Sequence, residues 1–410
     1  MAAINQLVNE QSNLIWRTTI NDHSTILQSK VVRWDGTSYF AESSISNAIT
    51  NASSGDTIFL KSGVFTENII LDKPGITIIG EGSGTWNGST CIGGTQLKAE
   101  TTGNTGFSWR DNAINCTLKD VALVAIPNLT ELSFFGSTGT PVFNCKVKNV
   151  SWYGNGANVH NVEFRGKNWY VENVKSYNAG DHNFAIKAAD SIFRDIFIDP
   201  IADSDATAIV VKSHISGNSS SPKNVIIDGW KVIFSGSTND EAGIFIENDG
   251  ATNEVTDNIM IKNGYVENLA SGNNYGIRLN GKDSSGNIIK NISIDNCVFK
   301  GCIVGVFFQT GLQGTAGRGI DGAVIRNCTF LDPAGAAPAN RTGVNNNDST
   351  GAAANVTVSN IYGIGYLADK LVVGAAYATN SGFGFDGDTD TNPATSAVIV
   401  QNITSLNRAT

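Results

Sequence analysis

The sequence predicts an all-β fold, a right-handed single-stranded parallel β-helix (solenoid) with an N-terminal capping helix, because two strand motifs recur in fixed alternation. The first motif is Gly or Ala followed by alternating apolar residues, at 185–188, 208–211, 243–246, 276–279, 305–308 and 382–385. The second motif ends in Asn or Asp, at Asp195, Asp228, Asn263, Asn296, Asn327, Asn360 and Asn402. Its steps are 33, 35, 33, 31 and 33 residues before a longer last one, which indicates a repeat architecture.

The alternation of apolar and polar residues within each motif is typical of strands with one buried face. No single repeat could bury that face alone, so the repeats are expected to stack into one core. Asn and Asp tolerate a left-handed backbone and hydrogen-bond to nearby main chain, so they suit a corner that the chain turns once in every repeat. These features together predict the β-helix.

Residues 41–55 are expected to form the capping helix. Ile45, Ala48 and Ile49 fall on one helical face, a serine is available as N-cap, and Gly55 is a candidate terminator. A helix at this place would cover the apolar core and the unpaired strand edges at the open end of the coil.

Residues 1–40 differ from the repeats. Their apolar residues have a loosely helical spacing, at Ile4, Leu7, Val8, Leu14 and Ile15. This segment is interpreted either as an arm for anchoring or oligomerisation or as a helix folded onto the coil.

Residues 56–410 are expected to form the coil itself. Ten or eleven rungs at the strand spacing of about 4.8 Å give a rod on the order of 50 Å long. Segments near 331–354 and 379–396 interrupt the repeat and are predicted to leave the coil as loops.

The composition narrows the choice of partners. The net charge of −9 argues against nucleic acid, because phosphate binding requires clustered Lys and Arg, and leaves glycans or proteins as expected partners. No apolar run is long enough to span a membrane, so membrane insertion is not expected. The first residues lack the features of a signal peptide, so the protein is expected to be made in a cytoplasm without conventional secretion, unless a leader has been removed. Cys116, Cys145, Cys297 and Cys328 each follow an Asn at a strand position and are expected to be reduced core thiols.

Aligning the first motif places two columns of side chains on the outside of the coil. They are Lys187, Val210, Phe245, Arg278 and Phe307, and beside them Ala189, Lys212, Glu247, Asn280 and Gln309. Neighbours in a column lie about 4.8 Å apart, so Lys212 and Glu247 are close enough to pair. The columns are either a solvated polar ladder or a substrate-binding surface formed by Lys187, Lys212, Glu247 and Arg278.

The segments 44–49, 55–60, 63–67 and 76–82 resemble the opening of pectate-lyase-like β-helix proteins. That superfamily includes pectinesterases, polysaccharide lyases, polygalacturonases, alginate epimerases and bacteriophage tailspikes. The resemblance implies the fold over most of the chain, and members with this opening have different chemistries.

Residues 180–187 also resemble the segment of polygalacturonases that carries an acidic pair before a strand, with His182 in place of the second Asp. The resemblance implies a carboxyl pair for glycoside hydrolysis, formed by Asp181 with Asp205 or Asp203, and His182 is an alternative acid or base. A lyase or epimerase would instead use Lys187, Lys212 or His182 as base and Arg278 to neutralise a uronate carboxylate.

Two further groups are candidates for ligand binding. Trp169 and Tyr170, in an aromatic cluster before Asp181, either stack on sugars or fill the core. Asp386, Asp388 and Asp390 alternate as calcium ligands would, although the EF-hand Gly and Glu are missing. No other cofactor or metal is expected.

The preferred functional hypothesis is a tailspike-like virion appendage of a bacteriophage. Such a protein would bind a cell-surface polysaccharide during host attachment, and in one version of the hypothesis it would also depolymerise that polysaccharide. It would contact other virion proteins through its N-terminal arm and would form a homotrimer. The alternatives are a self-standing extracellular hydrolase or lyase acting on an acidic glycan, and a purely structural virion protein.

Overall fold

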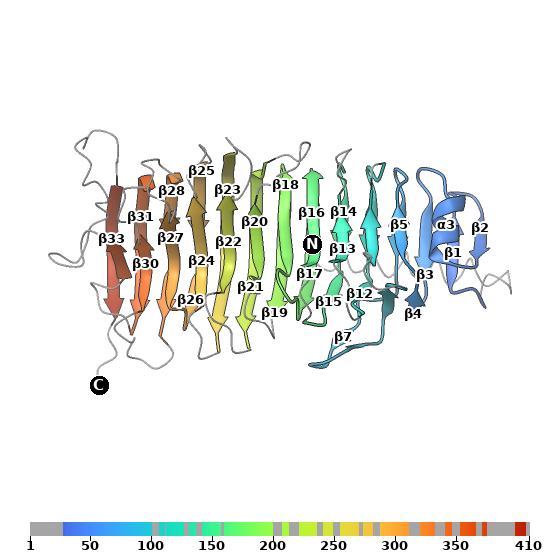
Figure 1. Cartoon of the computed structure of the whole chain (residues 1–410), viewed down its shortest axis with the longest axis horizontal. Coiled ribbons are helices and arrows are strands. Elements are labelled where there is room, and N and C mark those ends of the chain that lie inside the picture. Colours follow the sequence, from blue (N-terminus) through green and yellow to red (C-terminus); the bar gives the residue numbers. More distant parts are fainter. Residues whose placement is uncertain are drawn as a thin grey trace.

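The computed structural model describes most of the chain, and its strands stack along one long axis (Figure 1). The described residues are 28–100, 106–110, 112–126, 131–136, 142–156, 160–199, 207–212, 221–235, 241–248, 255–269, 274–281, 288–310, 320–332, 341–346, 353–365, 371–374 and 398–406. They form two long sheets and one small hairpin.

The larger sheet, called sheet A, has 20 strands. They are β1 (Val31–Trp34), β2 (Tyr39–Glu42), β3 (Thr57–Leu60), β4 (Gly63–Thr66), β6 (Thr77–Ile79), β9 (Thr95–Lys98), β11 (Thr117–Lys119), β12 (Ala122–Val124), β14 (Lys146–Lys148), β15 (Ser151–Tyr153), β17 (Tyr170–Tyr177), β19 (Ser191–Asp199), β21 (Lys223–Phe234), β23 (Val255–Asn268), β25 (Ile288–Asp295), β26 (Val298–Lys300), β28 (Ile320–Arg326), β29 (Thr329–Leu331), β31 (Ala353–Ile364) and β33 (Val398–Leu406).

The second sheet, called sheet B, has 11 strands. They are β5 (Ile69–Leu71), β10 (Phe107–Trp109), β13 (Glu131–Phe135), β16 (His160–Lys167), β18 (Phe184–Ala189), β20 (Ile209–Lys212), β22 (Ala242–Asn248), β24 (Tyr275–Gly281), β27 (Val304–Thr310), β30 (Thr342–Asn346) and β32 (Val372–Gly374). Strands β7 (Thr85–Trp86) and β8 (Cys91–Ile92) form an antiparallel hairpin.

The chain alternates between the two sheets, and the pairing from rung to rung is parallel, as between β16, β18 and β20. One strand of sheet B per turn gives 11 rungs, which agrees with the ten or eleven expected from the repeats. The predicted fold class, a right-handed parallel β-helix, is confirmed.

The corners of the coil are built from Asn and Asp in the left-handed conformation, as predicted. In the predicted series, Asp195, Asn263, Asn296, Asn327, Asn360 and Asn402 have φ between 52° and 56°, whereas at Asp228 the left-handed residue is the following Gly229, with φ of 68°. The side chains in this corner hydrogen-bond in a ladder, for example Asn263 to Asp228 and Asn296 to Asn263. A second such corner, which the sequence analysis missed, contains Asn144, Asn168, Asp190, Asn224, Asn258, Asn291 and Asn355.

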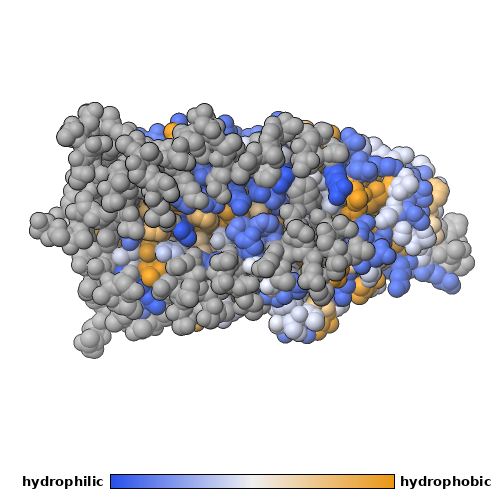
Figure 2. All heavy atoms as spheres, in the orientation of Figure 1, coloured by the Kyte–Doolittle hydropathy of each residue, from blue (hydrophilic) through white to orange (hydrophobic). Residues whose placement is uncertain are grey.

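The interior is a continuous apolar core that runs the length of the stack. The glycine of the first motif is explained by this core, because a Cβ on Gly276 would lie 2.2 Å from the Phe299 ring and one on Gly305 would lie 2.0 Å from the Phe330 ring. The four cysteines that follow Asn are buried and not bridged, as predicted. The described surface in Figure 2 mixes hydrophilic and hydrophobic patches along the rod.

The capping helix is α3 (Ile45–Asn51), shorter than the 41–55 expected. Ile45, Ala48 and Ile49 are its buried residues, and the N-cap Ser44 accepts a hydrogen bond from the amide of Asn47. The helix ends at the C-cap Ala52, so the prediction of Gly55 as terminator was wrong. Figure 1 shows α3 at one end of the stack.

Two boundaries also need correction. Residues 31–34, assigned to the N-terminal arm, form β1, which pairs antiparallel with β2 and β3 and extends sheet A. The predicted loop at 331–354 contains β30, which continues sheet B. The segment 379–396, including Asp386, Asp388 and Asp390, and residues 1–27 of the arm lie outside the described residues.

Candidate functional site

Among the described residues, His160, Asp181 and His182 form one compact group of reactive side chains, here called the Asp181 cluster. The Nε2 atom of His160 lies 3.5 Å from Oδ2 of Asp181, and Nδ1 of His182 lies 3.1 Å from its Oδ1. The two imidazole ring centres are 4.8 Å apart. The Asp181 side chain is 42% exposed, whereas the His160 and His182 side chains are 19% and 13% exposed, so solvent reaches the cluster through the carboxylate.

Neighbouring main chain and buried amides hold the cluster in place. The amide of Asn161 donates to the carbonyl of His182, which fixes the loop that follows β17 against the start of β16. The Asn161 side chain donates to the Ser176 hydroxyl and to Asn183 Oδ1, and the Ser176 hydroxyl also donates to Asn183 Oδ1. All three of these polar residues are buried. These hydrogen bonds restrain the adjoining backbone, although the Asn183 side-chain amide nitrogen is buried without a partner.

Both imidazoles favour the neutral form. Burial lowers the pKa of His160, against the opposing charge of Asp181. Burial also lowers the pKa of His182, well below its ordinary value, and His160 and the cations of Lys212 and Lys187 lower it further. A neutral imidazole has a nitrogen lone pair, so the cluster can accept a proton or bind a cation.

A buried ion-pair group adjoins the cluster on the outward face of sheet B. Lys187 Nζ lies 2.7 Å from Oε2 of Glu163, and Arg165 pairs with the other oxygen of the same carboxylate. Burial raises the pKa of Glu163, but the two cations outweigh it and hold that pKa below its ordinary value. Burial lowers the pKa of Lys187 despite Glu163. The carboxylate with two cationic partners is ionised, so Glu163 is no candidate proton donor.

The cations form one column along sheet B. Arg165 pairs in register with Lys187, and the pairing of Ile186 with Val211 brings Lys187 beside Lys212. Lys212 lies in register beside Glu247, as the repeat predicted. The predicted position of Lys187 beside Val210 was wrong, because Ala185 pairs with Val210.

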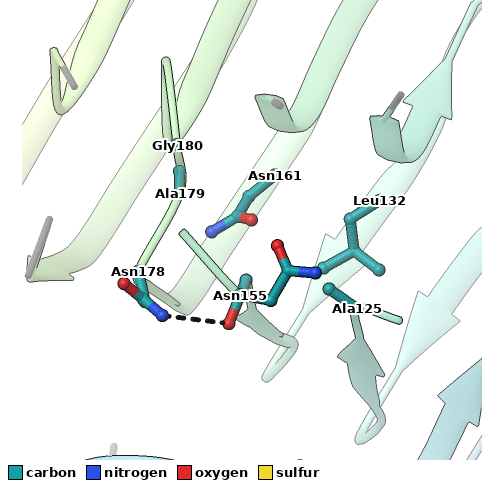
Figure 3. Close-up of a pocket in the computed structure, with 8 residues that line it drawn as sticks. Ala125, Leu132, Asn155, Asn161, Asn178, Ala179 and Gly180 are labelled. Carbon is teal, nitrogen blue, oxygen red and sulfur yellow. Dashed lines mark hydrogen bonds between the residues drawn. The ribbon is translucent and has the colours of Figure 1, made fainter. Parts of the chain in front are cut away.

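A small pocket lies next to the cluster (Figure 3). Its cavity volume is about 10 Å³, room for a single water molecule, and it is lined by Ala125, Leu132, Gly154, Asn155, Asn161, Asn178, Ala179 and Gly180. The amides of Asn155, Asn161 and Asn178 surround it in Figure 3, and Asn178 donates to the carbonyl of Gly154. Its lining residues Asn161 and Gly180 are sequence neighbours of His160 and Asp181, so a ligand at the cluster has polar partners beside it.

Arg278 lies three rungs from the cluster, about 14 Å along the sheet at the usual strand spacing. Its guanidinium lies 5.0 Å from the ring centre of Phe245 and 5.6 Å from that of Tyr275. The Tyr275 ring in turn stacks on Phe307 at 5.1 Å. These four residues, called the Arg278 cluster, share the outward face of sheet B with Lys212.

Several predicted site residues are therefore close together and others are not. Asp181, His182, Lys187 and Lys212 are neighbours, although Lys187 is only 6% exposed and is held by Glu163. The prediction that Trp169 stacks on sugars was wrong, because Trp169 is buried and stacks on Trp109 in the core. Tyr170 lies on sheet A, where its hydroxyl accepts from Arg194. Asp203 and Asp205 lie outside the described residues.

Three residues of the site were missed: His160, Glu163 and Arg165. They lie on β16, which carries the alternating pattern but lacks the Gly or Ala that marks the first motif. The alternation at 162–166 was the available signal, because it marks Glu163 and Arg165 as outward residues.

Comparison with known proteins gives only structural matches. No protein-family model matches the sequence, and no curated protein matches it. The catalytic domain of a GH87 alpha-1,3-glucanase is similar over 89% of this chain and 67% of its own, with 14% identity and a TM-score of 0.52. A polygalacturonase from Erwinia carotovora ssp. carotovora is similar over 81% and 94%, with 13% identity and a TM-score of 0.51.

The A-module of the Azotobacter vinelandii mannuronan C-5 epimerase AlgE6 covers 88% of this chain and 93% of its own, at 15% identity and a TM-score of 0.50. The enzymatically active domain of tailspike protein 2 of bacteriophage CBA120 has 12% identity and a TM-score of 0.49, and this chain spans 44% of its length. The likenesses with TM-scores of 0.50 to 0.52 show the parallel β-helix fold and leave the reaction open. In the part of the chain that the structure describes, no helix has the length and apolar character needed to cross a bilayer.

Proposed function

We propose that this protein binds an acidic polysaccharide along the outward face of sheet B and cleaves it at the Asp181 cluster. One observation carries the proposal: the accessible Asp181 carboxylate and the imidazoles of His160 and His182 lie beside a column of cations, in which Lys212 is partly exposed and Arg165 and Lys187 are buried against Glu163. In a chain of net charge −9, such a column attracts the carboxylates of an acidic glycan locally.

The Arg278 cluster supports the same surface. Sugars pack their flat apolar faces on aromatic rings, and a guanidinium binds a carboxylate through paired hydrogen-bond donors. Phe245 and Tyr275 provide the rings and Arg278 the guanidinium, while the buried Phe307 supports Tyr275 from beneath. A chain of several sugars lying along sheet B would contact the Asp181 cluster at one end and the Arg278 cluster at the other.

The cleavage chemistry has two candidate forms. Hydrolysis needs a second carboxyl group beside Asp181 that can reach the sugar, and Glu163 does not qualify because it is 1% exposed and both of its oxygens are paired with Lys187 and Arg165. Asp203 and Asp205 remain the predicted partners. In a lyase, a neutral base removes the C5 proton while cations neutralise the uronate carboxylate.

The test is incubation of the protein with acidic polysaccharides, such as polygalacturonate and alginate, and with a neutral glucan. Product size is followed by gel filtration, and ultraviolet absorbance of an unsaturated sugar distinguishes elimination from hydrolysis. The proposal expects the acidic polymers to be bound and shortened and Asp181→Asn to abolish the shortening. Binding of the neutral glucan alone would contradict it.

We further propose that the protein acts as a tailspike-like appendage of a bacteriophage particle and assembles as a homotrimer. A specific observation supports association: the outward residues Ile192, Ile226 and Met260 are neighbours in one column of sheet A, which continues through Ser293 to Val324, and Ile192, Met260 and Val324 are 36–38% exposed. Light scattering tests this, since a trimer supports the appendage and a monomer favours the self-standing enzyme.

A further inference from the structure

We propose that His160, Asp181 and His182 form a binding site for one divalent transition-metal ion such as Zn²⁺. The inference rests on the cluster alone and stands whether or not the glycan proposal holds. It adds a metal site to a chain whose sequence predicted none at these residues.

The first argument is distance. A tetrahedral zinc ion with ligands at 2.0–2.1 Å has neighbouring ligand atoms about 3.3 Å apart. In the cluster, the distances from Asp181 oxygens to the facing histidine nitrogens are 3.1 and 3.5 Å. One donor atom from each of the three residues lies within 4.8 Å of the other two. Small side-chain movements therefore suffice to surround an ion.

The second argument is the state of the donor atoms. His182 Nδ1 is buried and has no hydrogen-bond partner, since its contact with Asp181 is not aligned for one. The Nδ1 atom of His160 is also buried without a hydrogen-bond partner. A buried polar atom without a partner costs free energy, which a ligand bond at His182 would offset.

The third argument is rigidity. Asn161 and Asn183, which directly follow His160 and His182 in the sequence, are tied together with Ser176 in the buried amide network. The backbone hydrogen bond from Asn161 to His182 joins the two ligand segments. An ion thus meets donors whose positions are already restricted, so binding loses little conformational entropy.

The choice of ion follows from the donor set. Two imidazoles and one carboxylate suit zinc and other first-row transition ions, whereas Ca²⁺ and Mg²⁺ prefer all-oxygen sites. Three protein ligands leave at least one coordination position open, and the exposed side of Asp181 leaves that position accessible to solvent. A carboxylate or hydroxyl of a bound molecule could take it. With the ion bound, the three side chains act as ligands, so the acid or base role proposed above for the Asp181 cluster belongs to the metal-free protein.

The test uses the full chain after treatment with EDTA and dialysis. Calorimetric titration with ZnCl₂ should give one ion per chain, and Co²⁺ should produce visible absorption bands of nitrogen and oxygen coordination. His160→Ala, Asp181→Ala and His182→Ala should each weaken Zn²⁺ binding at least tenfold, since each removes one ligand. Glu172→Gln, on sheet A, serves as the matched control and should bind as the wild type does.

Thermal unfolding provides a second readout and guards against misfolded variants. Zn²⁺ should raise the Tm of the wild type but not that of the ligand variants. If an alanine variant is unfolded by circular dichroism, the shape-conserving His182→Gln replaces it. The proposal would be overturned if the wild type failed to bind Zn²⁺ or Co²⁺. It would also be overturned if the ligand variants bound Zn²⁺ as the wild type does, or if the wild type preferred Ca²⁺. Glycan degradation is measured in a separate assay. A negative result for Zn²⁺ binding therefore does not contradict the glycan proposal, and a negative result for glycan cleavage does not contradict the metal proposal.

Discussion

Lys187 and Glu163 form a buried ion pair across β16 and β18, with 2.7 Å between Nζ and Oε2 and both residues at most 6% exposed. Arg165 completes a group with one negative and two positive charges. The Glu163 carboxylate therefore keeps two cations compensated beneath the Asp181 cluster. Removing one partner from such a group leaves an uncompensated buried charge.

Glu163→Gln is predicted to destabilise the protein by about 3–5 kcal/mol at pH 7. The folded-state pKa of Glu163 lies below the ordinary value of 4.5, so its stabilisation is present above that pH and is lost as pH falls. Urea unfolding at pH 7 and at lower pH checks both effects, and the variant should show a smaller loss on acidification. Glu172→Gln, which breaks the surface pair with Lys148, is the control and should cost less than about 1 kcal/mol.

Asn263→Ala is predicted to lower stability by about 1–3 kcal/mol. The substitution removes the hydrogen bonds to Asp228 and from Asn296, and it places alanine, which favours the left-handed conformation less than asparagine does, at φ of 54°. Asn263→Gly accepts this φ without strain and should cost less. Equal urea midpoints for the two variants would show that the left-handed corner contributes nothing measurable.

Trp169→Ala is predicted to cost about 3–5 kcal/mol, because it empties a core position where the indole also donates to the carbonyl of Arg165. The milder Trp169→Phe should retain the fold and leave glycan affinity unchanged. Tyr170→Ala, on sheet A, should affect neither property strongly. Weaker glycan binding by folded Trp169→Phe would contradict the assignment of this ring to the core alone.

Lys212→Gln is predicted to weaken binding of polygalacturonate several-fold and to reduce its dependence on salt, because Lys212 is the most exposed cation of the column. Lys231→Gln, an exposed lysine of sheet A, is the control. Affinity measured at two salt concentrations tests the prediction. An equal loss from both substitutions would indicate non-specific attraction.

The fold was predictable because the repeat, the Asx corners and the inward alternation all reflect one local geometry. The register of β18 was not, because sliding a strand by two residues leaves the same side chains inward. Phe184, not Ile186, therefore pairs with Ile209, and Lys187 moves beside Lys212. His160 escaped prediction because its contact with Asp181 depends on which rungs are neighbours, which no local pattern contains.

The most direct test of the account is the size of an acidic polysaccharide after incubation with the wild type, with Asp181→Asn and with Glu172→Gln. The account predicts shortening by the wild type and by Glu172→Gln, and loss of shortening with Asp181→Asn. Equal shortening by all three proteins would contradict the assignment of the reaction to the Asp181 cluster. If no acidic polymer is either bound or shortened, the proposed function is contradicted.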